Sequence, residues 1–97
     1  MSPTGSDAER SRRTRRRLPE RVTRLRWLRD AAGDPPGCER RTVVDDAEVS
    51  ARPAGNRRVE LRVEPVDRGQ RLADEFFGRR YETRSESGGV VFTGEPL

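Results

Sequence analysis

Histidine, lysine and isoleucine are absent from this 97-residue chain, and cysteine occurs once, at Cys38. A single cysteine cannot form a disulfide within the chain, and the usual zinc sites of cysteine and histidine cannot be assembled without histidine. The missing histidine also removes the commonest general base, and no P-loop, Rossmann or EF-hand spacing occurs. The sequence therefore predicts a protein that is not an enzyme and that binds no metal or other cofactor.

The sequence also lacks long apolar runs. Crossing a bilayer takes about 18 apolar residues, and a secretory signal needs an apolar segment of about 7 to 15 residues. Neither pattern occurs, so we expect an intracellular, cytoplasmic protein without membrane contact.

Large apolar side chains are scarce, because leucine, valine and phenylalanine make up only 18 of the 97 residues. That fraction lies just below the ~20% at which disorder becomes a serious possibility. The net charge is only +4, however, and modest self-repulsion favours partial order. We expect one small domain with a thin core, completed by a dimer, by the basic helix described below or by another partner.

Basic charge comes from 21 arginines and is concentrated near the start of the chain. Residues 1–29 hold ten arginines and three acids (10 − 3 = +7), whereas residues 30–97 hold eleven arginines and fourteen acids (11 − 14 = −3). Arginine codons are GC-rich, and the codons of the missing lysine and isoleucine are AT-rich. A skewed codon supply is therefore an alternative explanation, under which the reading frame has no evolved function.

Residues 1–17 have no large apolar side chain after Met1, so this arm is expected to be disordered by itself. Guanidinium groups match phosphate oxygens bidentately, and a dense run of them gains free energy by releasing counterions from a nucleic acid. The arm is thus predicted to contact the phosphate backbone without reading sequence. Its five clustered arginines are Arg12, Arg13, Arg15, Arg16 and Arg17.

Residues 18–33 open with a proline and close with a glycine, which predicts a basic helix. The expected apolar stripe consists of Leu18, Val22, Leu25 and Ala32, with Leu28 at its margin. A strand is the competing prediction, because Leu25 and Trp27 alternate with arginines. On a helix Trp27 points away from the stripe beside Arg24, and this pair could stack an unpaired base, although an ordinary packing role for Trp27 is the competing interpretation.

Residues 34–39 form a Pro/Gly linker, where we place a domain boundary, and residues 40–97 form a small body. A strand is expected over 41–52, with Val43, Ala47, Val49 and Ala51 on one face and a turn or bulge at Asp45 and Asp46. Turn residues follow at 53–56. Apolar and charged residues then alternate over 58–64, which predicts a half-buried strand.

A short amphipathic helix is predicted after Pro65, with a capping arrangement of Asp67 and Gln70 and an end at Gly78. Tyr81 and Thr83, a loop over 85–89, and an apolar run over 90–92 then indicate a final hairpin. The expected fold class is α+β: a disordered basic arm and helix, then a β-β-α-β-β body with helices on one face of an antiparallel sheet.

Two other groups of residues could take part in chemistry. Arg40 and Arg41 could lower the pKa of Cys38, although an ordinary loop cysteine is the favoured interpretation. Two carboxylate pairs could hold a divalent cation if the fold brought them together, although solvated surface acids are favoured. These pairs are Asp45 with Asp46 and Asp74 with Glu75.

The leading hypothesis is a small nucleic-acid-binding accessory protein, with RNA or single-stranded DNA favoured over duplex. Its predicted contacts are Arg12, Arg13, Arg15, Arg16, Arg17, Arg24 and Trp27. The alternative is a protein-interaction or regulatory adaptor, antitoxin-like, in which the arm is incidental. That adaptor would bind a protein partner or a second copy through a sheet edge or through Leu72, Phe76 and Phe77.

Overall fold

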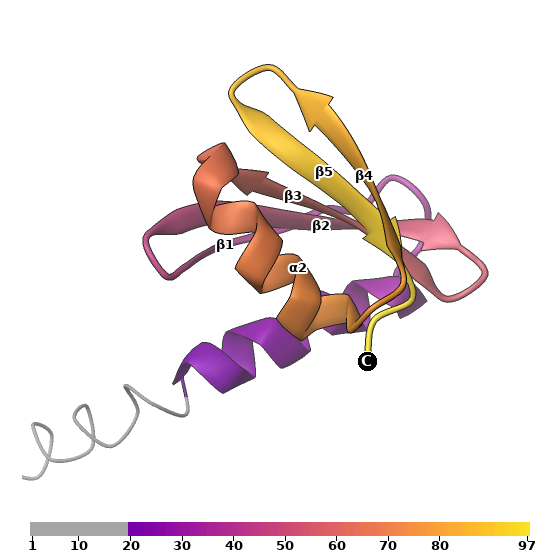
Figure 1. Ribbon diagram of the computed structural model, residues 1–97. Coiled ribbons are helices and arrows are strands. Elements are labelled where there is room, and N and C mark those ends of the chain that lie inside the picture. Colours follow the sequence, from indigo (N-terminus) through magenta and orange to yellow (C-terminus); the bar gives the residue numbers. More distant parts are fainter. Residues whose placement is uncertain (1–19) are drawn as a thin grey trace, which may run out of the picture.

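The computed structural model describes residues 20–97, which form one antiparallel sheet and helices packed on one of its faces (Figure 1). Residues 20–29 are α-helical and continue into the 3-10 turn η1 (Asp30–Gly33). The remaining elements are β1 (Arg40–Val44), β2 (Ala47–Gly55), β3 (Arg58–Glu64), η2 (Val66–Arg68), α2 (Gly69–Phe77), β4 (Tyr81–Glu86) and β5 (Gly89–Gly94). The predicted α+β class and the helical form of the basic segment are confirmed.

The sheet has the strand order β1-β2-β3-β5-β4, and every neighbouring pair is antiparallel. Successive hairpins join β1 to β2 and β2 to β3. The chain then crosses the sheet through α2 and returns along β4, so that β5 lies between β3 and β4. The strands at the two edges of the sheet are therefore β1 and β4.

The segment over 41–52 is two strands, because the interruption that the sequence allowed at Asp45 and Asp46 as a turn or a bulge is a turn. Asp45 and Asp46 have φ values of 52° and 64°, and Val44 pairs directly with Ala47. Two left-handed residues between paired neighbours make the tight turn that fits the twist of a hairpin. The body is therefore β-β-β-α-β-β. The turn also shifts the inward face, so Val44 is buried and Val43 is exposed.

Two local predictions also need correction. The turn expected at 53–56 lies at Asn56 and Arg57, because β2 continues through an irregularity to Gly55. The capping arrangement of Asp67 and Gln70 is wrong, since a 3-10 turn precedes α2 and no side chain caps its first turn. The expected end of the helix at Gly78 is confirmed, and its φ of 82° is one that glycine adopts without strain.

The core joins the sheet to both helices. Leu25, Leu28 and Ala31 belong to the same buried cluster as the inward residues of β2, β3, β5 and α2. The stripe of the basic helix is thus rotated from the expected one: Leu28 is central and fully buried, whereas Val22 is 52% exposed. The basic helix contributes directly to the thin core of the body. It was one of the three candidates expected from the sequence to complete this core. Within residues 20–97 no helix is long and apolar enough to cross a membrane.

Candidate functional site

The charge of the chain is divided sharply between its two parts. Residues 1–19 hold six arginines and two acids (6 − 2 = +4), and residues 20–97 hold fifteen arginines and fifteen acids (15 − 15 = 0). The whole net charge of +4 therefore belongs to the first nineteen residues. The five clustered arginines of the arm lie outside the described residues: Arg12, Arg13, Arg15, Arg16 and Arg17.

Arg24, which the sequence placed in the nucleic-acid interface, holds the basic helix against the sheet edge. Its Nη1 donates to the carbonyl oxygen of Val43 at 2.8 Å, and its Nη2 donates to Oε1 of Glu20 at 3.0 Å. Val43 belongs to the edge strand β1. Arg24 therefore satisfies a main-chain acceptor at this edge, and its charge is partly neutralised by Glu20.

The cation that lies over the ring of Trp27 comes from beyond the linker. The ring is stacked with Arg40, whose Cζ lies 5.3 Å from the ring centroid. Arg40 also donates to the carbonyl oxygen of Trp27 at 2.7 Å and makes two hydrogen bonds of 2.7 Å to Asp34. These hydrogen bonds hold the pKa of Asp34 below its ordinary value. One face of the ring is thus occupied, although 41% of Trp27 remains exposed.

No helical or strand spacing could have indicated the contact between Trp27 and Arg40. The two residues are thirteen positions apart, and the Pro/Gly linker lies between them. The linker turns the chain back so that the start of β1 lies beside the end of the basic helix. Trp27 and Arg40 are close together because the linker folds back between them.

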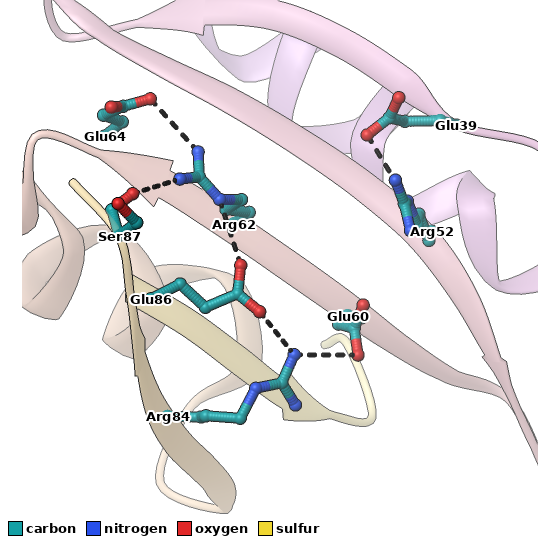
Figure 2. Close-up of polar contacts among 8 residues, drawn as sticks. All are labelled: Glu39, Arg52, Glu60, Arg62, Glu64, Arg84, Glu86 and Ser87. Carbon is teal, nitrogen blue, oxygen red and sulfur yellow. Dashed lines mark hydrogen bonds and ion pairs between the residues drawn. The ribbon is translucent and has the colours of Figure 1, made fainter. Parts of the chain in front are cut away.

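The outer face of the sheet, which the helices leave uncovered, has arginines neutralised by glutamates (Figure 2). Arg62 donates to Glu64 at 3.1 Å, to Glu86 at 3.3 Å and to the carbonyl oxygen of Ser87 at 2.9 Å. Arg84 lies 3.0 Å from Glu86 and 3.6 Å from Glu60. Hydrogen bonds from Arg84 and Arg62 lower the pKa of Glu86, so this carboxylate is ionised at neutral pH.

The arginines of this face also shield an apolar residue, Val91, from solvent. It pairs with Arg62 on one side and Arg84 on the other, and it is only 3% exposed although it lies on the outer face. The aliphatic stems of long charged side chains commonly cover apolar surface in this way. The described residues of this face include no aromatic side chain, so it offers no platform for stacked bases.

An open hollow of about 660 Å³ lies on this face over β1, β2 and β3. Its charged lining contains four glutamates and three arginines: Glu39, Glu48, Glu64, Glu86, Arg41, Arg52 and Arg62. Acidic groups outnumber basic ones, and Arg52 and Arg41 both lie beside Glu39. The hollow does not favour a phosphate group.

The fold brings together one carboxylate from each predicted pair, but around an arginine. Arg21 makes hydrogen bonds of 2.8 and 2.7 Å to Asp45 and of 2.7 and 2.8 Å to Glu75. These bonds lower the pKa of both carboxylates and raise that of Arg21. The guanidinium therefore occupies the position where a cation would bind. Residues 20–97 contain no group of three or more potential metal ligands.

Leu72, Phe76 and Phe77, the predicted protein interface, are buried in the core at 2%, 0% and 3% exposure. This corrects the expectation of an exposed apolar face on α2, because that face packs against the sheet. Cys38 is exposed, as expected for an ordinary loop cysteine. The two arginines that follow it closely in the sequence are paired with acids, Arg40 with Asp34 and Arg41 with Glu39.

Comparison with known proteins gives no relative from which a role could be transferred. No family model, curated protein or solved structure matches the chain.

Proposed function

We propose that this protein is a small nucleic-acid-binding accessory protein, in which the clustered arginines of residues 12–17 contact the phosphate backbone. The observation that supports the proposal is the division of charge. Residues 20–97 have a net charge of zero, so the entire excess of positive charge lies in the segment that precedes the folded body. A polyanion attracted to this chain will therefore meet the arm first.

The folded body acts as a neutral scaffold in this proposal. Arginines on its outer sheet face are paired with glutamates, and the hollow there has more acids than arginines. Arg24 and Trp27 have structural partners, so we omit both from the proposed interface. Five guanidinium groups remain for binding, and they recognise phosphates without reading base edges.

RNA and single-stranded DNA are the first ligands to test, because guanidinium groups can also stack on unpaired bases. Binding is measured by fluorescence anisotropy with labelled single-stranded RNA, single-stranded DNA and duplex DNA of equal length. If five or six phosphates are neutralised, the logarithm of the affinity falls against the logarithm of salt concentration with a slope of about −4 to −6.

The decisive comparison uses two variants that each lose five positive charges. In the arm variant Arg12, Arg13, Arg15, Arg16 and Arg17 become glutamine. In the body variant five exposed arginines become glutamine: Arg41, Arg57, Arg68, Arg71 and Arg79. We expect the arm variant to lose most of the affinity and of the salt slope, and the body variant to keep both.

Equal losses in the two variants would contradict the proposal, because they would indicate attraction to overall charge. Failure of the wild-type chain to bind any of the three oligonucleotides at low salt would also contradict it. A protein complex that is insensitive to salt and unchanged in the arm variant would instead support the adaptor hypothesis.

A further inference from the structure

The two edge strands of the sheet differ in how their outer edges are covered. On β1, the carbonyl oxygen of Val43 accepts a hydrogen bond from Arg24, and Arg40 ties the start of the strand to the basic helix. On β4, no main-chain group accepts or donates a comparable hydrogen bond among the described residues. Figure 1 shows β4 as the outermost strand on its side, next to β5 alone.

The open strand β4 has a sequence suited to further pairing. Its six residues include no proline or glycine, and its pairing with β5 is regular from Tyr81 to Glu86. An uncovered edge of this kind is a template for another strand. Natural proteins protect such edges with charges, so the arrangement of the charges on β4 decides which strand can approach.

We propose that β4 pairs with β4 of a second copy of this chain, antiparallel, around a two-fold axis at Thr83. Two five-stranded sheets would then form one continuous sheet. Pairing stops at two copies, because this contact uses the same edge of both chains and Arg24 already occupies the Val43 carbonyl oxygen on the other edge strand, β1. The inference does not depend on nucleic-acid binding by the arm.

Charge complementarity selects both the partner and the register. Glu82, Arg84 and Glu86 share the outer face, since they pair with Thr93, Val91 and Gly89 of β5. With Thr83 on the axis, Glu82 lies opposite Arg84 of the second copy, and this contact occurs twice. Arg80, just before the strand, then lies opposite Glu86 of the second copy. All four cross-strand contacts join opposite charges.

The neighbouring registers bring like charges together. With Arg84 on the axis, it lies opposite its own copy, and Glu82 lies opposite Glu86. With Glu82 on the axis, it lies opposite its own copy, and Arg80 lies opposite Arg84. Like charges directly opposite one another destabilise an antiparallel pair. Thr83 on the axis is therefore the only one of these three registers in which the strand is complementary to itself.

The two central side chains are exposed enough to make these contacts beside their present ion pairs. The Glu82 side chain is 79% exposed, and its ion pair with Arg58 is long, at 3.5 Å. The Arg84 side chain is 55% exposed, and its contact with Glu60 is long, at 3.6 Å, so its guanidinium can turn donors to a further carboxylate while it keeps Glu86. Thr83 is exposed, so a threonine pair can form across the axis.

Analytical ultracentrifugation of the full chain over a wide concentration range tests the proposal. We expect a monomer–dimer equilibrium for the wild type. Glu82→Arg and Arg84→Glu should each weaken the dimer about ten- to a hundredfold, because each converts two attractive contacts into repulsive ones. The double variant should recover the wild-type dimer, and an equimolar mixture of the single variants should form a mixed dimer.

Matched controls make equal changes of charge away from β4. Glu48→Arg and Arg57→Glu alter exposed residues that have no ion pair within residues 20–97, and both should dimerise as the wild type does. Circular dichroism establishes that each variant is folded. Arg84 contacts two glutamates of its own chain, so Glu82→Arg decides the test if Arg84→Glu does not fold.

Three results would overturn the proposal. The wild type could stay monomeric up to its solubility limit, which would mean that the charges of β4 protect the edge. A dimer could form that neither single substitution weakens, which would place the contact elsewhere. The double variant could dimerise no better than the weaker single variant, which would exclude the proposed register.

Discussion

The guanidinium of Arg40 covers the ring of Trp27, with Cζ 5.3 Å from the ring centroid. Two hydrogen bonds to Asp34 and one to the Trp27 carbonyl oxygen hold the guanidinium in place. Through these contacts the single tryptophan of the chain packs at the junction between the basic helix and β1. A base could therefore stack only on the face of the Trp27 ring that Arg40 leaves uncovered.

We predict that Trp27→Leu changes the affinity for single-stranded RNA or DNA by no more than about twofold. A base stacked on the ring would contribute about 1–3 kcal/mol, so its loss would weaken binding from about fivefold to more than a hundredfold. Anisotropy titrations of the variant and the wild type measure the difference. Strong quenching of the wild-type Trp27 fluorescence by a bound oligonucleotide would argue for stacking.

Arg24→Gln should lower the free energy of unfolding by about 1 kcal/mol, because the carbonyl oxygen of Val43 loses its charged donor at the sheet edge. Urea denaturation followed by circular dichroism measures the change. Arg26→Gln is the matched control: Arg26 is exposed on the same helix and has no ion pair within the described residues. We expect that control to shift stability by less than about 0.5 kcal/mol. Equal effects would rule out a specific role for the edge contact.

The contact of Arg21 with Asp45 and Glu75 should make stability depend on pH. Because Arg21 lowers the folded pKa of both carboxylates below their ordinary values of 3.8 and 4.5, the stabilisation is complete above those values. It is lost as the pH falls through the lower, folded values. Arg21→Gln should therefore cost about 1 kcal/mol at pH 7, and this difference from the wild type should shrink below pH ~4.

Urea denaturation of the wild type and of Arg21→Gln between pH 7 and pH 3 measures this difference in stability. Other carboxylates titrate in both proteins, so their contribution cancels in the difference. Arg79→Gln, at an exposed position, serves as the control for loss of charge alone. A difference between Arg21→Gln and the wild type that stays constant across this range would show that ionisation of Asp45 and Glu75 contributes nothing.

Gly69 lies at a close approach of α2 to the sheet. A Cβ atom at this position would come within 2.6 Å of Val90 Cγ1 and 2.9 Å of a ring carbon of Phe92. Gly69→Ala should therefore destabilise the protein by about 1–3 kcal/mol, because the core must shift to admit the methyl group. Gly33→Ala has open space around the new methyl group and should have little effect. Thermal unfolding of the two variants compares them directly; similar melting temperatures would contradict the packing argument.

The sequence alone determined the features that depend on local periodicity and composition. Val59, Leu61 and Val63 alternate with charged residues, and they are buried as a strand of period two requires. Leu72, Phe76 and Phe77 have helical spacing and form the inner face of α2. The division of charge between residues 1–19 and the rest can likewise be read directly from the chain.

Only the tertiary structure decided how these elements meet. The turn at Asp45 and Asp46 needs two left-handed residues in succession, and the apolar period could not distinguish such a turn from a bulge, so the third strand before α2 was missed. Arg21 contacts carboxylates 24 and 54 residues away, and Trp27 contacts an arginine beyond the linker. Periodicity reports which face of an element is buried, whereas the partner of each charge depends on how the chain turns between elements.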